Sequence, residues 1–266
     1  MVTRNRFAAL NATRRTWAIA AVHGESDRLQ QIHAQISDHF TPGDTLVYLG
    51  NYFGRGPDVA GVIQELLLFR RVVIGLPGGE VEDVVFLRGA QEEMWQKLLT
   101  IQFAPNPKEV LHWMLNMGVG ATLQAYGSNP QEGQVAARDG VRSLTQWTNR
   151  LRAEMRQRDG HNALMSAMQR AAYRDDNSVL FVSAGIDPSR PLSEQTDSFW
   201  WGDREFTKLD AAYGDYQTVV RGFDPQQRGP LETPFTATLD AGCGFGGPLR
   251  AVCYGTNGKP ELILEA

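Results

Sequence analysis

The stretch "VVFLRGAQEEM" (residues 84–94) decides the fold of this chain, because a buried strand passes into a helix with almost no loop between them. Apolar β-formers predict a strand over residues 83–89 that ends in Arg-Gly, and "EEMWQKLLTIQ" predicts a helix directly after it. Open α/β sheets place their ligands at such carboxyl ends of strands. Ala90 and Gln91, which stand at this junction, carry no group that ionises near neutral pH.

Working outward from this stretch, apolar runs alternate with helical patterns in the first half of the chain. Leu29, Ile32, Ile36 and Phe40 share one face of a predicted helix, and Asp58 favours the start of another over 58–69. Further strands are predicted at 16–22, 45–50, 178–185, 218–222, 236–242, 249–255 and 261–266. Asn-Gly in "TNGKP" joins the last two as a hairpin.

This order predicts an α/β protein with one domain over residues 1–266. A helical insertion occupies about 92–175, and a run of antiparallel strands extends the sheet at the C-terminal end. The residues before 16 read as a polar lead-in.

Composition favours an ordinary globular protein. The chain has 266 residues, a net charge of −4 and 42% apolar residues, which argues against nucleic acid or an anionic membrane as a partner. The Arg-rich stretch "RLRAEMRQR" (150–158) is expected to be a solvated helix face. Cys243 and Cys253 lack metal or redox spacing and are expected to be free thiols, and no apolar leader is evident, so a cytoplasmic location is expected.

Eight motifs in order resemble the calcineurin-like metallophosphoesterases, of the bacterial serine/threonine protein phosphatase type. They cover about residues 16 to 266. They are "AIAAVHG" (18–24), "YLGNYFGRGPD" (48–58), "VVFLRGAQEEM" (84–94), "NMGVGATLQAYG" (116–127), "LFVSAG" (180–185), "SFWWGDREF" (198–206), "VVRGFDP" (219–225) and "LDAGCGFGGPLRAV" (239–252). The resemblance implies a layered αββα sandwich. It also implies a site for two divalent metals, such as manganese, iron or zinc, that hydrolyses phosphoproteins or dinucleoside polyphosphates.

The resemblance also implies which positions would hold the metals. In this chain the positions of the six ligands are occupied by Ala21, His23, Asn51, Ala90, Ser183 and Phe223. Gln91 stands where the family has a histidine general acid, and Gly54 where it has that histidine's aspartate partner. One imidazole and one amide do not make a two-metal site, and glutamine cannot exchange a proton near neutral pH.

Two arginines near these positions could hold an anion without metal. Arg55 matches the family's phosphate-binding arginine, and Arg221 lies two residues before Phe223. A guanidinium binds oxyanions bidentately, so Arg55, Arg221 and Asn51 could form an anion pocket. The alternative is that both arginines neutralise carboxylates or extend their charged ends to solvent. His23 is better explained as a structural, hydrogen-bonded histidine than as a metal ligand.

Other patterns favour structure over chemistry. "GCGFGG" (242–247) follows a strand without a helix to receive a phosphate, so it predicts a turn. Trp200 and Trp201 favour core packing, with the cap of a groove as the alternative.

Two functions follow. The first is a catalytically inactive phosphatase-like protein, or pseudophosphatase, without a metal cofactor, which binds a protein partner or a phosphorylated ligand. The second is a divergent metal-dependent phosphoesterase that recruits other donors, such as Glu25, Asp27, Glu92 or Asp187.

Overall fold

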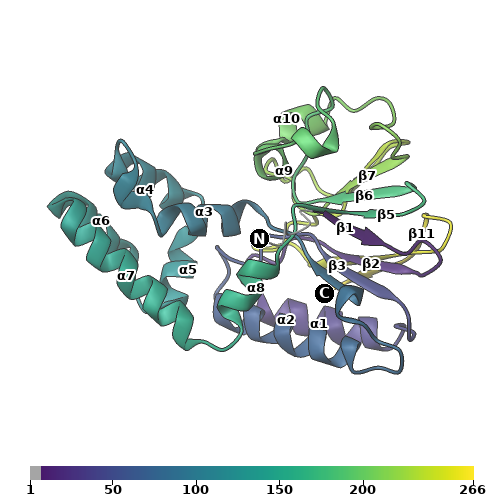
Figure 1. The fold of residues 1–266 in the computed structure, drawn as a ribbon, viewed down its shortest axis with the longest axis horizontal. Helices are drawn as coiled ribbons and strands as arrows, with labels where there is room; N and C mark the ends of the chain where they lie inside the picture. Colours follow the sequence, from purple (N-terminus) through teal and green to yellow (C-terminus); the bar gives the residue numbers. More distant parts are fainter. Residues whose placement is uncertain (1–6) are drawn as a thin grey trace.

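The protein is built from two stacked β-sheets with helices on their outer faces (Figure 1). The computed structural model describes residues 7–266, so residues 1–6 of the predicted domain lie outside the described part. Helices α1 and α2 cover one sheet, α9 and α10 lie against the other, and most of the remaining helices project to one side as the insertion (Figure 1).

The first sheet has five strands in the order β11–β10–β2–β3–β4. Their bounds are β2 Thr16–Ile19, β3 Thr45–Tyr48, β4 Val84–Phe86, β10 Arg250–Tyr254 and β11 Pro260–Glu265. Strands β2, β3 and β4 are parallel and are joined by α1 (Ser26–Ser37) and α2 (Val59–Ile74), as the alternating pattern predicts. Asp58 caps α2 by accepting a hydrogen bond from the Gly61 amide at 2.8 Å, which confirms its expected place.

The second sheet has six strands in the order β1–β5–β6–β7–β9–β8. Their bounds are β1 Phe7–Leu10, β5 Ala171–Arg174, β6 Val179–Val182, β7 Thr218–Arg221, β8 Leu231–Glu232 and β9 Thr236–Thr238. Two expectations are corrected here. The polar lead-in contains strand β1, which is stabilised by its pairing with β5 and has no strong strand signal of its own. Strand β5 itself lies inside the range predicted to be helical.

The C-terminal strands do not form one antiparallel tail. Only β10 and β11 form the predicted hairpin, and β10 joins the first sheet antiparallel to β2. Strands β7 and β9 instead pair in parallel within the second sheet. Local sequence cannot distinguish these partners, because the strands with which β7, β9 and β10 pair are distant in the sequence.

Successive residues of β6 show how the layers are held together. Phe181 belongs to the core between the two sheets. Its neighbours Leu180 and Val182 point the opposite way and pack with Phe199 of α9 (Ser198–Trp201) and Phe206 of α10 (Asp203–Phe206). Successive side chains of β6 are thus buried on opposite faces of its sheet, one face against the other sheet and one against helices, which confirms the layered αββα architecture.

The helical insertion runs from the end of β4 to the start of β5. Its helices are α3 Ala90–Leu98, α4 Pro107–Asn116, α5 Val119–Ala125, α6 Pro130–Asp139, α7 Val141–Gln157 and α8 His161–Ala167. Its base is aromatic: Trp95 stacks on Tyr126 with centroids 5.0 Å apart, and Phe53 packs edge-on against both rings. The insertion therefore rests on the loop that follows β3 and is anchored at the carboxyl ends of the strands.

Within residues 7–266, no helix is both long and apolar enough to cross a bilayer.

Candidate functional site

The carboxyl ends of strands from both sheets meet at the predicted site. The Ala21 amide, after β2, donates to the Gly222 carbonyl, after β7, at 2.9 Å. The Phe223 amide donates to the Ser183 carbonyl at 2.9 Å, and the His23 amide donates to the Asn51 carbonyl at 2.7 Å. The fold thus brings together positions that lie up to 202 residues apart in the sequence.

An apolar cluster occupies part of this meeting point. Ala21, Ala184 and Phe223 are buried against one another, and the partly exposed Phe245 covers them. Phe245 lies in the "GCGFGG" segment, which forms the expected turn, with Gly242, Gly244 and Gly246 at positive φ. Positions that the family resemblance assigns to an aspartate and a histidine ligand are therefore packed as hydrocarbon.

His23 is enclosed by this cluster. Its ring packs edge-on against Phe223 and Phe245, with centroids 4.9 and 5.6 Å away. It is fully buried, and neither ring nitrogen makes a hydrogen bond within residues 7–266. Burial, with the positive charge of Arg55, lowers the pKa of His23 to about 3, so the ring is neutral under physiological conditions.

The asparagine at the family's bridging position has a structural task. Asn51 Oδ1 accepts a hydrogen bond from the Gln91 amide at 3.0 Å, in the first turn of α3. Its Nδ2 is buried and has no hydrogen-bond partner within the described chain. The oxygen that could face a cation is therefore used to hold α3.

Gln91 and Gly54 fit each other as a pair. A Cβ at Gly54 would lie 2.3 Å from Gln91 Oε1, so no larger residue fits at 54 while this glutamine keeps its rotamer. Gln91 Nε2 donates to the Met117 carbonyl at 2.8 Å, which links the start of α3 to the end of α4. The residues at these two positions of the family resemblance are thus packed against each other.

The loop backbone nevertheless keeps an unusual shape. His23, Asn51 and Arg55 adopt φ values of 50°, 56° and 57°, in the left-handed region that non-glycine residues rarely occupy. Such conformations cluster at functional sites, where the surrounding structure holds them in place.

Glu92 is the group that holds this loop. Its buried carboxylate accepts hydrogen bonds from the amides of Asn51, Tyr52, Phe53 and Gly89 at 2.7–3.0 Å. Burial raises the pKa of Glu92, while the four amides act in the opposite direction. Its expected role as a substitute metal donor is therefore corrected, because both oxygens are occupied. The position of Glu92 three residues after Gly89, the capping-box spacing, was the available sequence signal.

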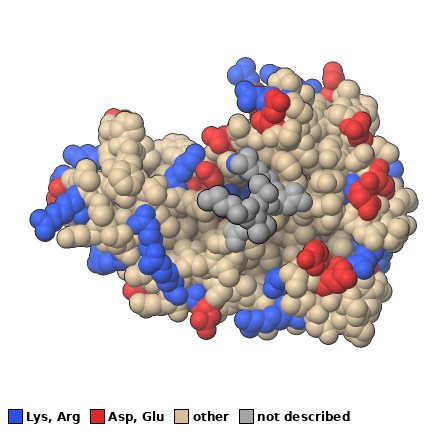
Figure 2. All heavy atoms as spheres, viewed as in Figure 1, with Lys and Arg blue, Asp and Glu red and all other residues tan. Residues whose placement is uncertain are grey.

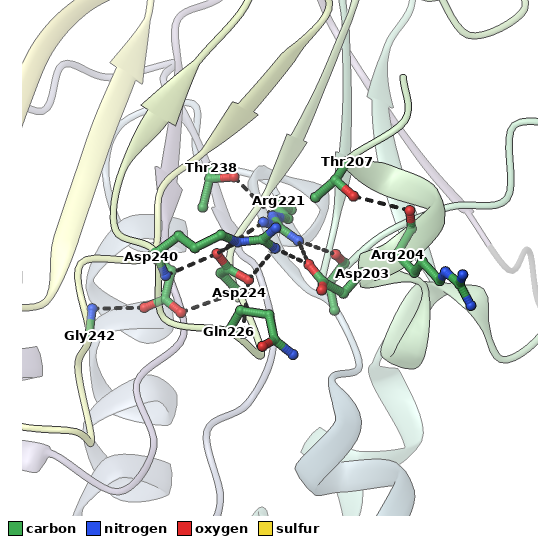
Figure 3. Close-up of polar contacts among 11 residues, drawn as sticks. Asp203, Arg204, Thr207, Arg221, Asp224, Gln226, Thr238, Asp240 and Gly242 are labelled. Atoms are coloured by element: carbon green, nitrogen blue, oxygen red, sulfur yellow. Dashed lines mark hydrogen bonds and ion pairs between the residues drawn. The ribbon is translucent and has the colours of Figure 1, made fainter. Parts of the chain in front are cut away.

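The two arginines predicted to bind an anion differ in the structure. Arg221 is buried and donates to Asp203 Oδ1 at 2.7 Å, and it lies 3.2 Å from Asp224 (Figure 3). Arg228 pairs with the same two carboxylates. Although burial alone would raise it, these arginines hold the pKa of Asp224 at about 2. Arg221 is thus neutralised by carboxylates, the alternative left open by its sequence.

Of the two arginines, Arg55 remains the candidate for binding an anion. Its guanidinium lies over the Phe245 ring, 4.1 Å from the centroid, and its amide donates to the Gly118 carbonyl at 3.1 Å. Burial lowers its pKa, and it has no carboxylate partner among residues 7–266.

The residues present do not fit a dinuclear metal centre. Within the described part of the chain, no three histidine, cysteine, aspartate or glutamate side chains converge as metal ligands. Of the proposed substitute donors, Glu92 is occupied and Asp187 is bound to Ser189 and Arg190. Within residues 7–266, the polar side chains at the ligand positions are those of His23, Asn51 and Ser183.

Comparisons with solved structures place this geometry in a known fold. A putative diadenosine tetraphosphatase superimposes with a TM-score of 0.55 and 18% identity, covering 98% of each chain. A protein serine/threonine phosphatase from Saccharomyces cerevisiae gives 0.52 at 12% identity, over 94% of this chain and 76% of its own. A cold-active protein-tyrosine phosphatase of a psychrophilic Shewanella gives 0.50 at 14%, over 97% and 82%.

The chain has the calcineurin-like metallophosphoesterase fold. No family model and no curated protein matches its sequence. The likeness in three dimensions thus spans nearly the whole chain, while its sequence has diverged far from these structures.

Replacing Glu92 tests what holds the loop. We expect Glu92→Ala to lower the free energy of unfolding by on the order of 4 kcal/mol, because four buried amides lose their acceptor. Urea unfolding followed by circular dichroism measures this loss. Glu93→Ala, at a partly exposed neighbour paired with Arg88, is the matched control and is expected to cost under about 1 kcal/mol. Equal losses in the two variants would contradict the role of Glu92.

The buried His23 predicts a pH dependence of stability. Its pKa in the folded protein, about 3, lies below the ordinary histidine value of 6.5, so the unfolded chain binds the proton first. The free energy of unfolding is therefore highest above pH 6.5 and decreases as the pH falls toward 3, with His23 contributing at most about 1.4 kcal/mol per pH unit. Asparagine tolerates the left-handed backbone at this position, so His23→Asn is expected to remove this pH-dependent contribution. Unfolding curves between pH 4 and 7 measure the difference, and the exposed His39→Asn is the control. An unchanged pH slope in His23→Asn would refute the assignment.

Proposed function

We propose that this chain is a pseudophosphatase, a protein with a phosphoesterase fold that acts by binding and not by hydrolysis. The observation that carries this proposal is the apolar cluster of Ala21, Ala184 and Phe223 at the strand ends, covered by Phe245. Hydrocarbon there supplies no ligand for a cation and no acid for a leaving group. The divergent phosphoesterase is the weaker alternative. Glu92 and Asp187 are bound by other groups, and no three histidine, cysteine, aspartate or glutamate side chains of residues 7–266, Glu25 and Asp27 included, converge as metal ligands.

Polar atoms around the cluster support a binding role. Five residues contribute buried polar atoms that lack a hydrogen-bond partner within residues 7–266: His23, Asn51, Arg55, Gln91 and Ser183. Unpaired buried polar groups reduce stability, so their concentration in one place favours a site kept for something other than folding. Asn51 Nδ2, Arg55 Nε and the Ser183 hydroxyl are donors, which suits an anionic ligand such as a phosphorylated group.

The surface favours a protein partner over nucleic acid. On the face seen in Figure 2, basic and acidic side chains are interspersed and no broad basic patch forms. We further propose that the protein works in the cytoplasm, where its buried Cys243 and Cys253 thiols stay reduced.

Metal content and turnover test the proposal. The purified protein is expected to contain far less than one equivalent of manganese, iron or zinc by mass spectrometry. It is also expected not to hydrolyse an aryl phosphate with added manganese, under conditions in which an active protein of this fold does. Two equivalents of metal, or turnover that is lost in His23→Ala, would overturn it.

Restoring the family's ligands tests whether only the side chains are missing. The combined replacements are Ala21→Asp, Asn51→Asp, Ala90→Asn, Ser183→His and Phe223→His. Because the left-handed loop geometry is still present, we expect this variant to gain manganese binding in isothermal titration calorimetry. Adding His23→Ala to it is expected to weaken that binding. A folded variant that binds no manganese would contradict the view that the backbone remains competent.

A further inference from the structure

A second candidate site lies beside the outer helices α9 and α10. A cavity of about 260 Å³ opens between the loop after β6 and helices α9 and α10. Asp187, Asp197 and Glu205 line it together with Arg190 and the indole of Trp201. None of these residues belongs to the cluster around Phe223.

The charges in this cavity are unbalanced. Asp187 is neutralised by Arg190 at 3.3 Å and also accepts hydrogen bonds from Ser189. The side chains of Asp197 and Glu205 make no hydrogen bond or ion pair with any described residue. Two carboxylates without a countercharge favour a cationic occupant.

Tryptophan supplies the apolar part of the same site. Trp200 is buried in the core, as predicted for the pair, whereas its neighbour Trp201 is half-buried and lines the cavity. Trp113 of α4 is 45% exposed and lies against Trp201, with centroids 5.7 Å apart and planes at 55°. Tryptophan is enriched at the centres of protein interfaces, and an indole face attracts cations.

The size of the cavity selects the kind of ligand. Pockets for drug-sized molecules and cofactors measure about 300–1,000 Å³, so this one is too small for most of them. It offers room for one long side chain. A guanidinium combines stacking on an aromatic face with charged hydrogen bonds to carboxylates, which an ammonium does less well.

We propose that this cavity, lined by Trp201, Asp197 and Glu205, is a docking site for an arginine side chain of a protein partner. Because Trp113 of the insertion lies against Trp201, a bound partner would lie beside the insertion. The biological role of this site rests on the proposed function, because a protein that acts by binding needs a docking site for its partner. The binding itself can be measured whether or not the chain hydrolyses phosphate.

Titration with a minimal probe tests the site. Acetyl-arginine methylamide is added to the full chain, and the indole N–H signals of its six tryptophans are followed by nitrogen-15 NMR. Trp113→Phe and Trp201→Phe assign the two relevant signals. We expect these two to shift, with a Kd on the order of millimolar, and the shift to weaken in 0.5 M salt. Acetyl-citrulline methylamide, the neutral isostere, is expected to leave them unchanged.

Matched variants distinguish binding at this cavity from a general effect of negative surface charge. Asp197→Asn/Glu205→Gln is expected to weaken binding about tenfold, whereas Asp38→Asn/Glu82→Gln removes two exposed carboxylates elsewhere and leaves it unchanged. Equal binding of arginine and citrulline, or equal weakening by both double variants, would overturn the proposal. Because the probe carries no phosphate, these outcomes are independent of the metal and turnover assays.

Discussion

The hydrogen bonds that Glu92 accepts constrain everything else at the strand ends. A single buried carboxylate receives four backbone amides, three from consecutive residues after β3 and one from the turn before α3. Backbone donors aimed at one point can be satisfied by a compact acceptor with several lone pairs, which the Glu92 carboxyl group provides. The loop therefore keeps its left-handed residues, and Asn51 of this loop accepts a hydrogen bond from the Gln91 amide at the start of the helical insertion. The shape of this loop is in this way maintained by one buried carboxyl group.

The changes at the site are consistent in charge as well as in shape. Two divalent cations normally offset the buried carboxylates around them, so carboxylates left alone would repel one another in a region of low dielectric. Here the ligand positions contain alanine, serine, phenylalanine and a neutral amide, and His23 is uncharged. Arg221 is balanced by Asp203 and Asp224 in a separate network (Figure 3). The ligand positions within residues 7–266 therefore carry no charged side chain.

The insertion connects the two places where binding is proposed. At its base, the Gln91 amide donates to Asn51, and Phe53 packs against Trp95 and Tyr126, which fixes the insertion to the loop after β3. On its other side, Trp113 contacts Trp201, which lines the acidic cavity. A partner held at that cavity would therefore lie beside the insertion that also carries Gln91.

The sequence alone determined the parallel αβ units of the first half, the Asp58 cap and the terminal hairpin, because each depends on local periodicity and turn chemistry. Its motif order also identified which positions gather at the site. It could not place β1 or β5, nor separate β7 and β9 from the C-terminal hairpin, because strand pairing depends on distant partners. Only the tertiary structure showed that Glu92 holds the loop, that Arg221 is neutralised and that Phe245 covers His23. Those roles are set by which groups meet in space: a side chain's type limits the bonds it can make, and the fold decides which bonds form.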